Sequence, residues 1–175
     1  MSEVIKKMLS RRSVREYKSE MVPKDIIERI LEAGTFAATG MGKQSPIMLA
    51  ITKKEVRDKL SEMVRKAKGK EEGVDPFYGA PVAIVVLADK NISTHVYDGS
   101  LVMGNLMLAA HELGLGSCWI HQAKEVFQTE EGKKFLEKFG IKGDYEGIGS
   151  CVLGYATGDI SQAKPRKESY IYYAE

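Results

Sequence analysis

The chain has 175 residues, of which 43% are hydrophobic and 29% charged, and its formal net charge at pH 7 is +2. This composition predicts one globular domain over residues 1–175 with a hydrophobic core, and it excludes an intrinsically disordered chain. The small net charge argues against a nucleic-acid-binding protein, and the lack of about 18 consecutive apolar residues argues against a membrane protein.

The first part of the chain predicts three helices and one strand. An amphipathic helix is expected over residues 2–12, and we expect a cytoplasmic protein because the N-terminus lacks the apolar core of a signal peptide. A second helix begins at Pro23 and is ended by Gly34. Residues 47–52 predict a short strand, and residues 53–67 predict an amphipathic helix.

The middle of the chain contains its most apolar segments. Residues 82–87 form a continuous apolar run rich in β-branched side chains, which predicts a strand buried on both faces. Residues 98–113 predict a helix that is hydrophobic on nearly every side. We expect this helix, with Leu106 near its centre, to be a central core helix or a subunit interface.

The last part of the chain returns to strands. Residues 115–120 and 147–156 each predict a strand, and residues 123–139 between them predict one helix or two, because Gly132 interrupts the pattern. The aromatic tail over residues 170–173 is expected to pack against another surface, with a partner subunit as one candidate. The mixture of helices and strands indicates an α+β protein.

Two basic clusters lie near the two ends of the chain, Arg11-Arg12-Ser13-Val14-Arg15 and Lys164-Pro165-Arg166-Lys167. Guanidinium groups offer planar, permanently charged donors that suit a phosphate, and a serine hydroxyl adds a short donor. A single cluster of this kind is most often a solvated surface. Two clusters on a chain of nearly balanced charge suggest the two halves of one anion site.

The chain offers no set of side chains for catalysis or metal binding. His95, His111 and His121 are not spaced as metal ligands, and His111 is expected to be a core residue. Cys118 and Cys151 lie in apolar segments without CxxC spacing and are expected to be small buried residues. The sequence also lacks a Rossmann turn and a P-loop. An enzyme of this composition would leave its chemistry to a bound cofactor.

Four segments, in this order, resemble the FMN-dependent nitroreductase family. They are residues 11–15, 37–46, 105–120, and 152–155 followed by 164–166. The resemblance is to the compact members of the family and covers nearly the whole chain. It implies a nitroreductase-like α+β fold, with a central, mostly antiparallel sheet flanked by helices. It also implies an intertwined homodimer with one FMN at each of two sites built from both subunits.

The resemblance assigns the cofactor contacts residue by residue. The flavin phosphate would be bound by Arg11, Arg12, Ser13, Lys164 and Arg166. Arg15 matches the basic residue that faces the pyrimidine edge of the flavin and stabilises the reduced ring. The loop that reaches FMN from the other subunit matches Thr39, Gly40, Met41, Gly42 and Gln44. His121 and Gln122 match the backbone contact near the flavin N5.

Two departures from the family pattern affect the loop. Gly42 stands where an asparagine is common, and Ser45-Pro46 stands where Pro-Trp is frequent. These departures leave open which polar contacts the loop makes, and the two loop glycines also fit an ordinary turn.

The resemblance implies an FMN-dependent NAD(P)H oxidoreductase. NADH or NADPH would reduce the flavin, and a nitroaromatic, a quinone or a similar planar acceptor would then reoxidise it by a ping-pong mechanism. Phe77, Tyr78 and the C-terminal tyrosines are the candidates for lining the acceptor face. Ene reduction, dehalogenation and a flavin-binding regulatory or storage role with little turnover remain as alternatives.

Overall fold

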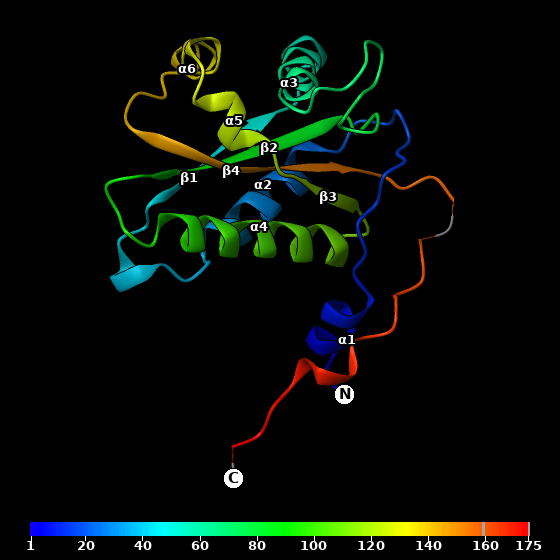
Figure 1. Cartoon of the computed structure of the whole chain (residues 1–175). Coiled ribbons are helices and arrows are strands. Elements are labelled where there is room, and N and C mark those ends of the chain that lie inside the picture. Colours follow the sequence, from blue (N-terminus) through cyan, green and yellow to red (C-terminus); the bar gives the residue numbers. More distant parts are fainter. Residues whose placement is uncertain (159, 175) are drawn as a thin grey trace.

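The computed structural model describes residues 1–158 and 160–174. Its centre is a four-stranded antiparallel sheet in the order β1-β2-β4-β3 (Figure 1). The strands are β1 (Pro46–Ile51), β2 (Val82–Asp89), β3 (Gly116–Ile120) and β4 (Tyr145–Gly154). This arrangement confirms the predicted α+β fold with an antiparallel sheet.

Helices cover both faces of the sheet. They are α1 (Glu3–Ser10), α2 (Lys24–Thr35), α3 (Lys54–Ala67), α4 (His95–Glu112), α5 (Ala123–Phe127) and α6 (Glu130–Glu137). Figure 1 shows α3, α5 and α6 on one face and α2 and α4 on the other. Two short 3-10 helices complete the fold: η1 (Gly40–Gly42) lies between α2 and β1, and η2 (Glu168–Tyr170) lies in the C-terminal segment after β4. No helix of the described residues is long and apolar enough to cross a membrane.

Strand β2 is the middle of the core, as its continuous apolar run predicts. Its side chains alternate between the two faces of the sheet, because successive residues of a strand point in opposite directions. Val85 and Leu87 are fully buried in the cluster under α3, α5 and α6. Ile84 and Val86 are fully buried in the cluster against α2 and α4. The prediction of a strand buried on both faces is confirmed.

The prediction that Gly34 ends the second helix is wrong. Helix α2 continues to Thr35, and Gly34 is buried inside it. A Cβ atom at this position would lie 2.9 Å from Leu106 Cδ2 and 2.9 Å from Met48 Sδ. Gly34 therefore lets α2 pack closely against α4 and β1, and its role is in packing rather than in helix termination.

The segment after β3 forms two helices, but Gly132 does not separate them. The break comes earlier, at Gln128 and Thr129, and α6 starts with Thr129 as its N-cap. The backbone N–H of Gly132 donates to Thr129 Oγ1 at 3.0 Å. A side chain at Gly132 would collide with the carbonyl oxygen of Val126. Glycine is needed here because α5 and α6 meet at this point.

Within one chain, helix α4 is buried on one side only, so of the two expected settings the structure excludes a helix enclosed by its own core and leaves the subunit interface as a prediction. Val102, Met103 and Leu106 are buried against the sheet and α2. Tyr97 and Leu101 point away from this core and are 72% and 50% exposed. The helix also starts at His95, three residues before the predicted start.

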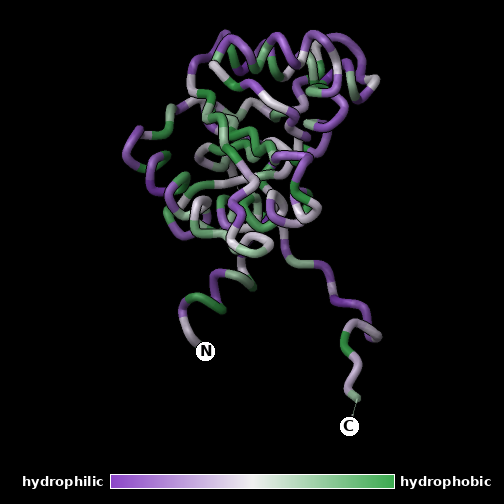
Figure 2. The backbone as a smooth tube through the Cα atoms, turned by 90° about the vertical axis from the view of Figure 1, so that its left-hand side faces the viewer, coloured by the Kyte–Doolittle hydropathy of each residue, from purple (hydrophilic) through white to green (hydrophobic). Residues whose placement is uncertain are grey.

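The two ends of the chain extend away from the sheet. Figure 2 shows the N-terminal and C-terminal segments projecting from the same side of the body. Helix α1 ends at Ser10, before the predicted end, and its apolar side chains Val4 and Leu9 are 60% and 59% exposed. Residues 170–173 are also exposed, so the packing expected for the aromatic tail does not form within one chain.

Candidate functional site

The segment that follows α1 is attached to the open edge of the sheet. Residues 11–17 form a parallel bridge from Ser13 to Ser117 in β3 and an antiparallel bridge from Tyr17 to Ala156, just after β4. The first basic cluster lies outside any helix, and these bridges to the sheet hold its backbone in place. The structure corrects the prediction that Arg11 and Arg12 belong to α1.

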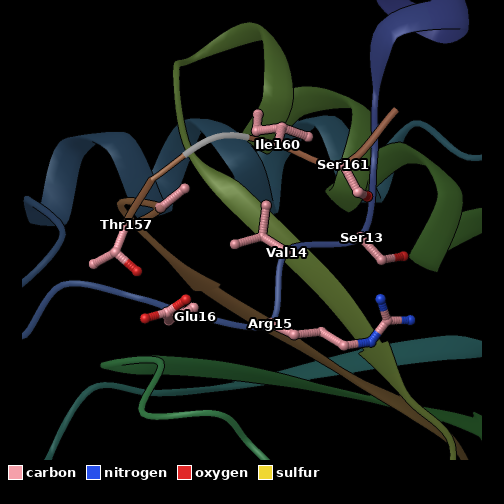
Figure 3. Close-up of a pocket in the computed structure, with 8 residues that line it drawn as sticks. Ser13, Val14, Arg15, Glu16, Thr157, Ile160 and Ser161 are labelled. Atoms are coloured by element: carbon pink, nitrogen blue, oxygen red, sulfur yellow. The ribbon is translucent and has the colours of Figure 1, made fainter. Parts of the chain in front are cut away.

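Alternation along this segment separates core side chains from candidate ligand-binding side chains. Val14 is buried, and a Cβ atom at Gly116 would lie 2.8 Å from the Val14 side chain, so Val14 packs directly on β3. The backbone N–H of Val14 donates to the Ser117 carbonyl at 2.9 Å. Ser13 and Arg15, on either side, extend their polar groups toward the same side (Figure 3).

The two basic clusters meet in one cavity of about 750 Å³. The first cluster contributes Arg11, Arg12 and Ser13, and the second contributes Lys164 and Arg166. The exposed apolar side chains of Met8 and Leu9 complete part of the wall. The five residues that the resemblance assigns to the flavin phosphate thus lie around one space, although the sequence separates them by about 150 positions.

Two guanidinium nitrogen atoms of the arginines that line this cavity have no acceptor within the described part of the chain. Arg11 Nη1 and Arg12 Nε are buried and have no hydrogen-bond partner among the described residues. Arg12 Nη1 donates to the carbonyls of Leu9 and Arg11, at 2.7 Å each, which holds that side chain at the end of α1. Buried donors without acceptors are costly and are usually satisfied by a partner. The donor set fits an anionic oxygen ligand such as a phosphate.

A second, smaller hollow of about 240 Å³ adjoins the basic cavity. Ser13 and Ser161 line both spaces, and Arg15, Ala156 and Thr157 line the smaller one (Figure 3). Arg15 is exposed, in contrast to the half-buried Arg11. Arg15 therefore lies next to the basic cavity but outside it, apart from Arg11 and Arg12. In this position it could contact a different part of a ligand whose phosphate is bound in the basic cavity.

The C-terminal end of β3 carries further polar groups without partners. Trp119 Nε1 and Gln122 Oε1 are buried and have no hydrogen-bond partner in the described part of the chain. His121 is exposed, and its carbonyl accepts from the N–H of Ala123 at 2.7 Å. Trp119 lies against Gly149 of β4, where any side chain would collide with the indole. The sequence analysis proposes His121 and Gln122 as cofactor contacts and does not include the Trp119 indole, which packs against Gly149 on the neighbouring strand.

The loop over residues 39–44 is not part of this cavity. It lies at the N-terminal end of α4, where the N–H of Gly40 donates to Asp98 Oδ1 at 2.9 Å. Helix α1 is held at the opposite end of α4, where Lys7 Nζ lies 3.2 Å from Glu112 Oε2. Fourteen residues of helix separate Asp98 from Glu112, which is about 21 Å. Within one chain, the loop and the basic cavity are therefore kept apart (Figure 1).

The two cysteines are free and buried, as predicted. They lie on adjacent strands but face opposite sides of the sheet, since Cys118 belongs to one core cluster and Cys151 to the other. Burial raises the pKa of Cys118, and it raises the pKa of Cys151 to about 12. Both groups are therefore thiols at neutral pH, which is not the form that reacts as a nucleophile.

Two expectations about individual side chains are wrong. Phe77 is fully buried under the guanidinium of Arg57, which lies 5.4 Å from the ring centroid, so Phe77 cannot line an acceptor face. His111 is only half-buried, and its Nε2 lies 2.8 Å from Ser10 Oγ. It joins α4 to α1 beside the basic cavity, where burial and the neighbouring Lys7 lower its pKa. Tyr78 remains partly exposed.

Comparison with known proteins places the chain among curated relatives with related names. A protein of Archaeoglobus fulgidus, provisionally named NADH dehydrogenase/NAD(P)H nitroreductase, is 30% identical over 100% of this chain and 92% of its own length. A Methanothermobacter thermautotrophicus protein with the same provisional name is 31% identical over 67% of this chain. That alignment spans 60% of the Methanothermobacter protein, which is less than two thirds of its length.

Comparison with solved structures gives the same result. The crystal structure of a nitroreductase with bound FMN from Bacteroides fragilis superposes with a TM-score of 0.93, at 28% identity over 100% of both chains. The sequence model of the nitroreductase family matches residues 8–155, from the end of α1 to just past β4. The chain belongs to the nitroreductase family.

Proposed function

We propose that the chain is an FMN-dependent NAD(P)H oxidoreductase that reduces planar acceptors such as nitroaromatics and quinones. The observation that carries this proposal is the cavity in which the first basic cluster meets the second. It is lined by Arg11, Arg12, Ser13, Lys164 and Arg166, and two buried guanidinium nitrogen atoms there have no acceptor among the described residues. The nitroreductase from Bacteroides fragilis, which has the same fold, contains bound FMN. The names of the two curated relatives supply NAD(P)H as the electron donor.

The residues of the cavity fit the phosphate of FMN. Arg11, Arg12 and Arg166 provide charged N–H donors, Lys164 adds a point charge, and the Ser13 hydroxyl adds a short donor. When bound, FMN supplies the redox chemistry, accepting a hydride from NADH or NADPH and passing electrons to the acceptor in a second half-reaction. The chain itself binds and orients the cofactor and needs no catalytic acid or nucleophile.

Arg15 and the end of β3 would contact the flavin ring. A guanidinium beside the pyrimidine edge stabilises negative charge that develops there on reduction, because a fixed charge needs no reorganisation. The backbone of His121 and Gln122 directly follows β3, which ends at Ile120. These groups would orient the ring and leave one of its faces open to the donor and acceptor in turn.

The active form would be an intertwined homodimer. Exposed apolar side chains occur on α1, on the outer side of α4 and in the tail, and a surface of this extent is usually covered by a partner. These side chains are Val4, Met8, Leu9, Tyr97, Leu101, Ile171 and Tyr172. The loop over residues 39–44 lies at the far end of α4 from its own basic cavity. In a two-fold dimer that pairs the α4 helices in opposite directions, the loop of one copy would reach the cavity of the other.

Three related points remain predictions. The same cofactor cavity would serve the alternative functions, which are ene reduction, dehalogenation and flavin binding with little turnover. A cytoplasmic location stays a prediction. One domain over residues 1–175 agrees with the two core clusters packed on the faces of a single sheet.

Anaerobic stopped-flow mixing of the FMN-loaded protein with NADH or NADPH tests the proposal. We expect rapid loss of the oxidised flavin absorbance with at least one donor, followed by recovery when a quinone or nitroaromatic is added. A flavin that bleaches slowly or not at all would favour the binding-protein alternative. A colourless protein that neither takes up FMN nor gains thermal stability from it would contradict the proposal.

A further inference from the structure

A buried carboxylate lies at the N-terminal end of α4. Asp98 is 2% exposed and accepts three hydrogen bonds. Its Oδ1 accepts from the N–H of Gly40 at 2.9 Å, and its Oδ2 accepts from Ser45 Oγ at 2.7 Å and from Thr94 Oγ1 at 3.1 Å. Two of these donors, Gly40 and Ser45, belong to the loop that follows α2. Asp98 therefore connects that loop to α4 at two points, Gly40 and Ser45.

The environment of Asp98 keeps its side chain charged. Burial alone would raise the pKa of the carboxyl group, but the hydrogen bonds from Ser45, Gly40 and Thr94 outweigh burial and lower it. A buried charge is tolerated only when donors of this kind surround it. Loss of one partner would leave the others unsatisfied, so the loop and the carboxylate stabilise one another.

The loop that Asp98 holds has a strained backbone. Met41 and Gln44 adopt φ angles of 53° and 49°, in the left-handed region that residues other than glycine rarely occupy. The N–H of Gln44 donates to Thr39 Oγ1 at 3.1 Å, which closes the loop on itself. Gly40 is pressed against Thr94, because any side chain there would collide with the threonine. Strained conformations persist where surrounding contacts determine them, and such sites are often functional.

The strain presents an apolar side chain to solvent. Met41 is 84% exposed, although methionine is a side chain that usually lies in a core. Gln44 and Lys43 beside it are also exposed. A loop held by hydrogen bonds and carrying an exposed apolar side chain indicates a contact with another molecule. The basic cavity of the same chain is not that contact, because about 21 Å of helix α4 separate the two.

We propose that Asp98 is a positioning residue, which clamps residues 39–45 in the form that presents Met41 and Gln44 to the flavin ring bound by the second copy. The inference rests on the proposed function, because it takes the FMN cavity and the homodimer from there. Asp98 acts through the loop and touches no cofactor atom. Its loss should therefore weaken contacts to the ring and leave contacts to the phosphate unchanged.

Titration with FMN and with riboflavin separates these two kinds of contact. We expect Asp98→Ala to weaken both flavins by the same factor, on the order of tenfold, which corresponds to the loss of about one polar contact. Asp98→Asn should restore most of the affinity, since its amide oxygen can still accept from Gly40 and the two hydroxyls can turn to accept from its NH₂ group. Asp144→Asn removes an exposed carboxylate that pairs with Lys90 and should leave both affinities unchanged.

The outcomes distinguish this inference from the proposed function. A wild-type protein that binds neither flavin would overturn the proposed function. A wild-type protein that binds FMN, with Asp98→Ala either unchanged or weakened for FMN alone, would overturn the role of Asp98. If Asp98→Ala does not fold, Ser45→Ala removes one donor from the same clamp. It should weaken FMN and riboflavin equally, by a smaller factor, and equal affinities in Ser45→Ala and wild type would contradict the inference.

Discussion

At the scale of single residues, two arginines of the basic segment after α1, Arg11 and Arg15, lie in different environments. Arg11 is half-buried at the larger cavity, and its Nη1 has no acceptor in residues 1–158 and 160–174, whereas Arg15 is exposed beside the smaller hollow. The difference follows from the extended backbone between them and from Val14, which fixes the segment on β3. The two guanidiniums should therefore affect different properties of a bound flavin.

Replacement of Arg15 tests this division. We expect Arg15→Ala to lower the reduction potential of the bound flavin, because the reduced ring loses a positive neighbour. A loss of about 1.4 kcal/mol would appear as roughly 30 mV for a two-electron couple. Arg15→Lys should restore only part of the effect, since a point charge replaces a planar group. Redox titration of each variant checks this, and a potential identical to wild type in Arg15→Ala would show that Arg15 lies elsewhere.

At the scale of the elements, close packing of α2 on α4 supports both the core and the loop that follows α2. Gly34 is the contact point, with no room for a methyl group beside Leu106 and Met48. We expect Gly34→Ala to lower the free energy of unfolding by about 1–3 kcal/mol, because overpacking outweighs the gain in helix propensity. Glu32→Ala, on an exposed position of the same helix, is the control and should change it little. Urea denaturation measures both, and a stabilised Gly34→Ala protein would contradict the packing argument.

Periodicity in the sequence predicts most of these elements, since a buried face leaves a regular pattern of apolar residues. The strand over residues 82–87 and the amphipathic helix over residues 53–67 are examples that the structure confirms. The two glycines were misread for a physical reason. A glycine that ends a helix and a glycine that permits close packing look alike in sequence, and only the three-dimensional neighbours of Gly34 and Gly132 separate the cases.

The candidate site was predictable where residue chemistry is specific. Clustered arginines with a serine indicate an anion site, and the structure places residues 11–13 and 164–166 around one cavity. Asp98 was not identified as part of a site, because it stood only as the first residue of the predicted helix over residues 98–113. Its partners Gly40 and Ser45 are more than fifty positions away, and no local pattern indicates such contacts.

At the scale of the whole molecule, the exposed side of α4 is a surface that the proposed homodimer would cover. Leu106 is buried in the core of its own chain, so it is not the residue to change, and Leu101 is the exposed apolar residue at the middle of that side. We expect Leu101→Asp to yield a monomer that has also lost FMN, because each site would need both copies. The control is Val74→Asp, which changes a similarly exposed apolar residue on the loop after α3. We expect the Val74→Asp protein to remain a dimer. Light scattering with flavin absorbance decides this, and a monomer that retains FMN tightly would contradict shared sites.

The most direct measurement is the affinity for FMN and for riboflavin after loss of one basic side chain from either end of the chain. Arg11→Ala and Arg166→Ala should each weaken FMN by about tenfold to a hundredfold, the cost of one charge-assisted hydrogen bond. Riboflavin, which has no phosphate, should bind both variants as it binds the wild type. Arg29→Ala, on an exposed position of α2, should match wild type for both ligands. If riboflavin affinity falls in step with FMN, or if FMN affinity is unchanged in both variants, the two clusters do not hold one phosphate and the account is wrong.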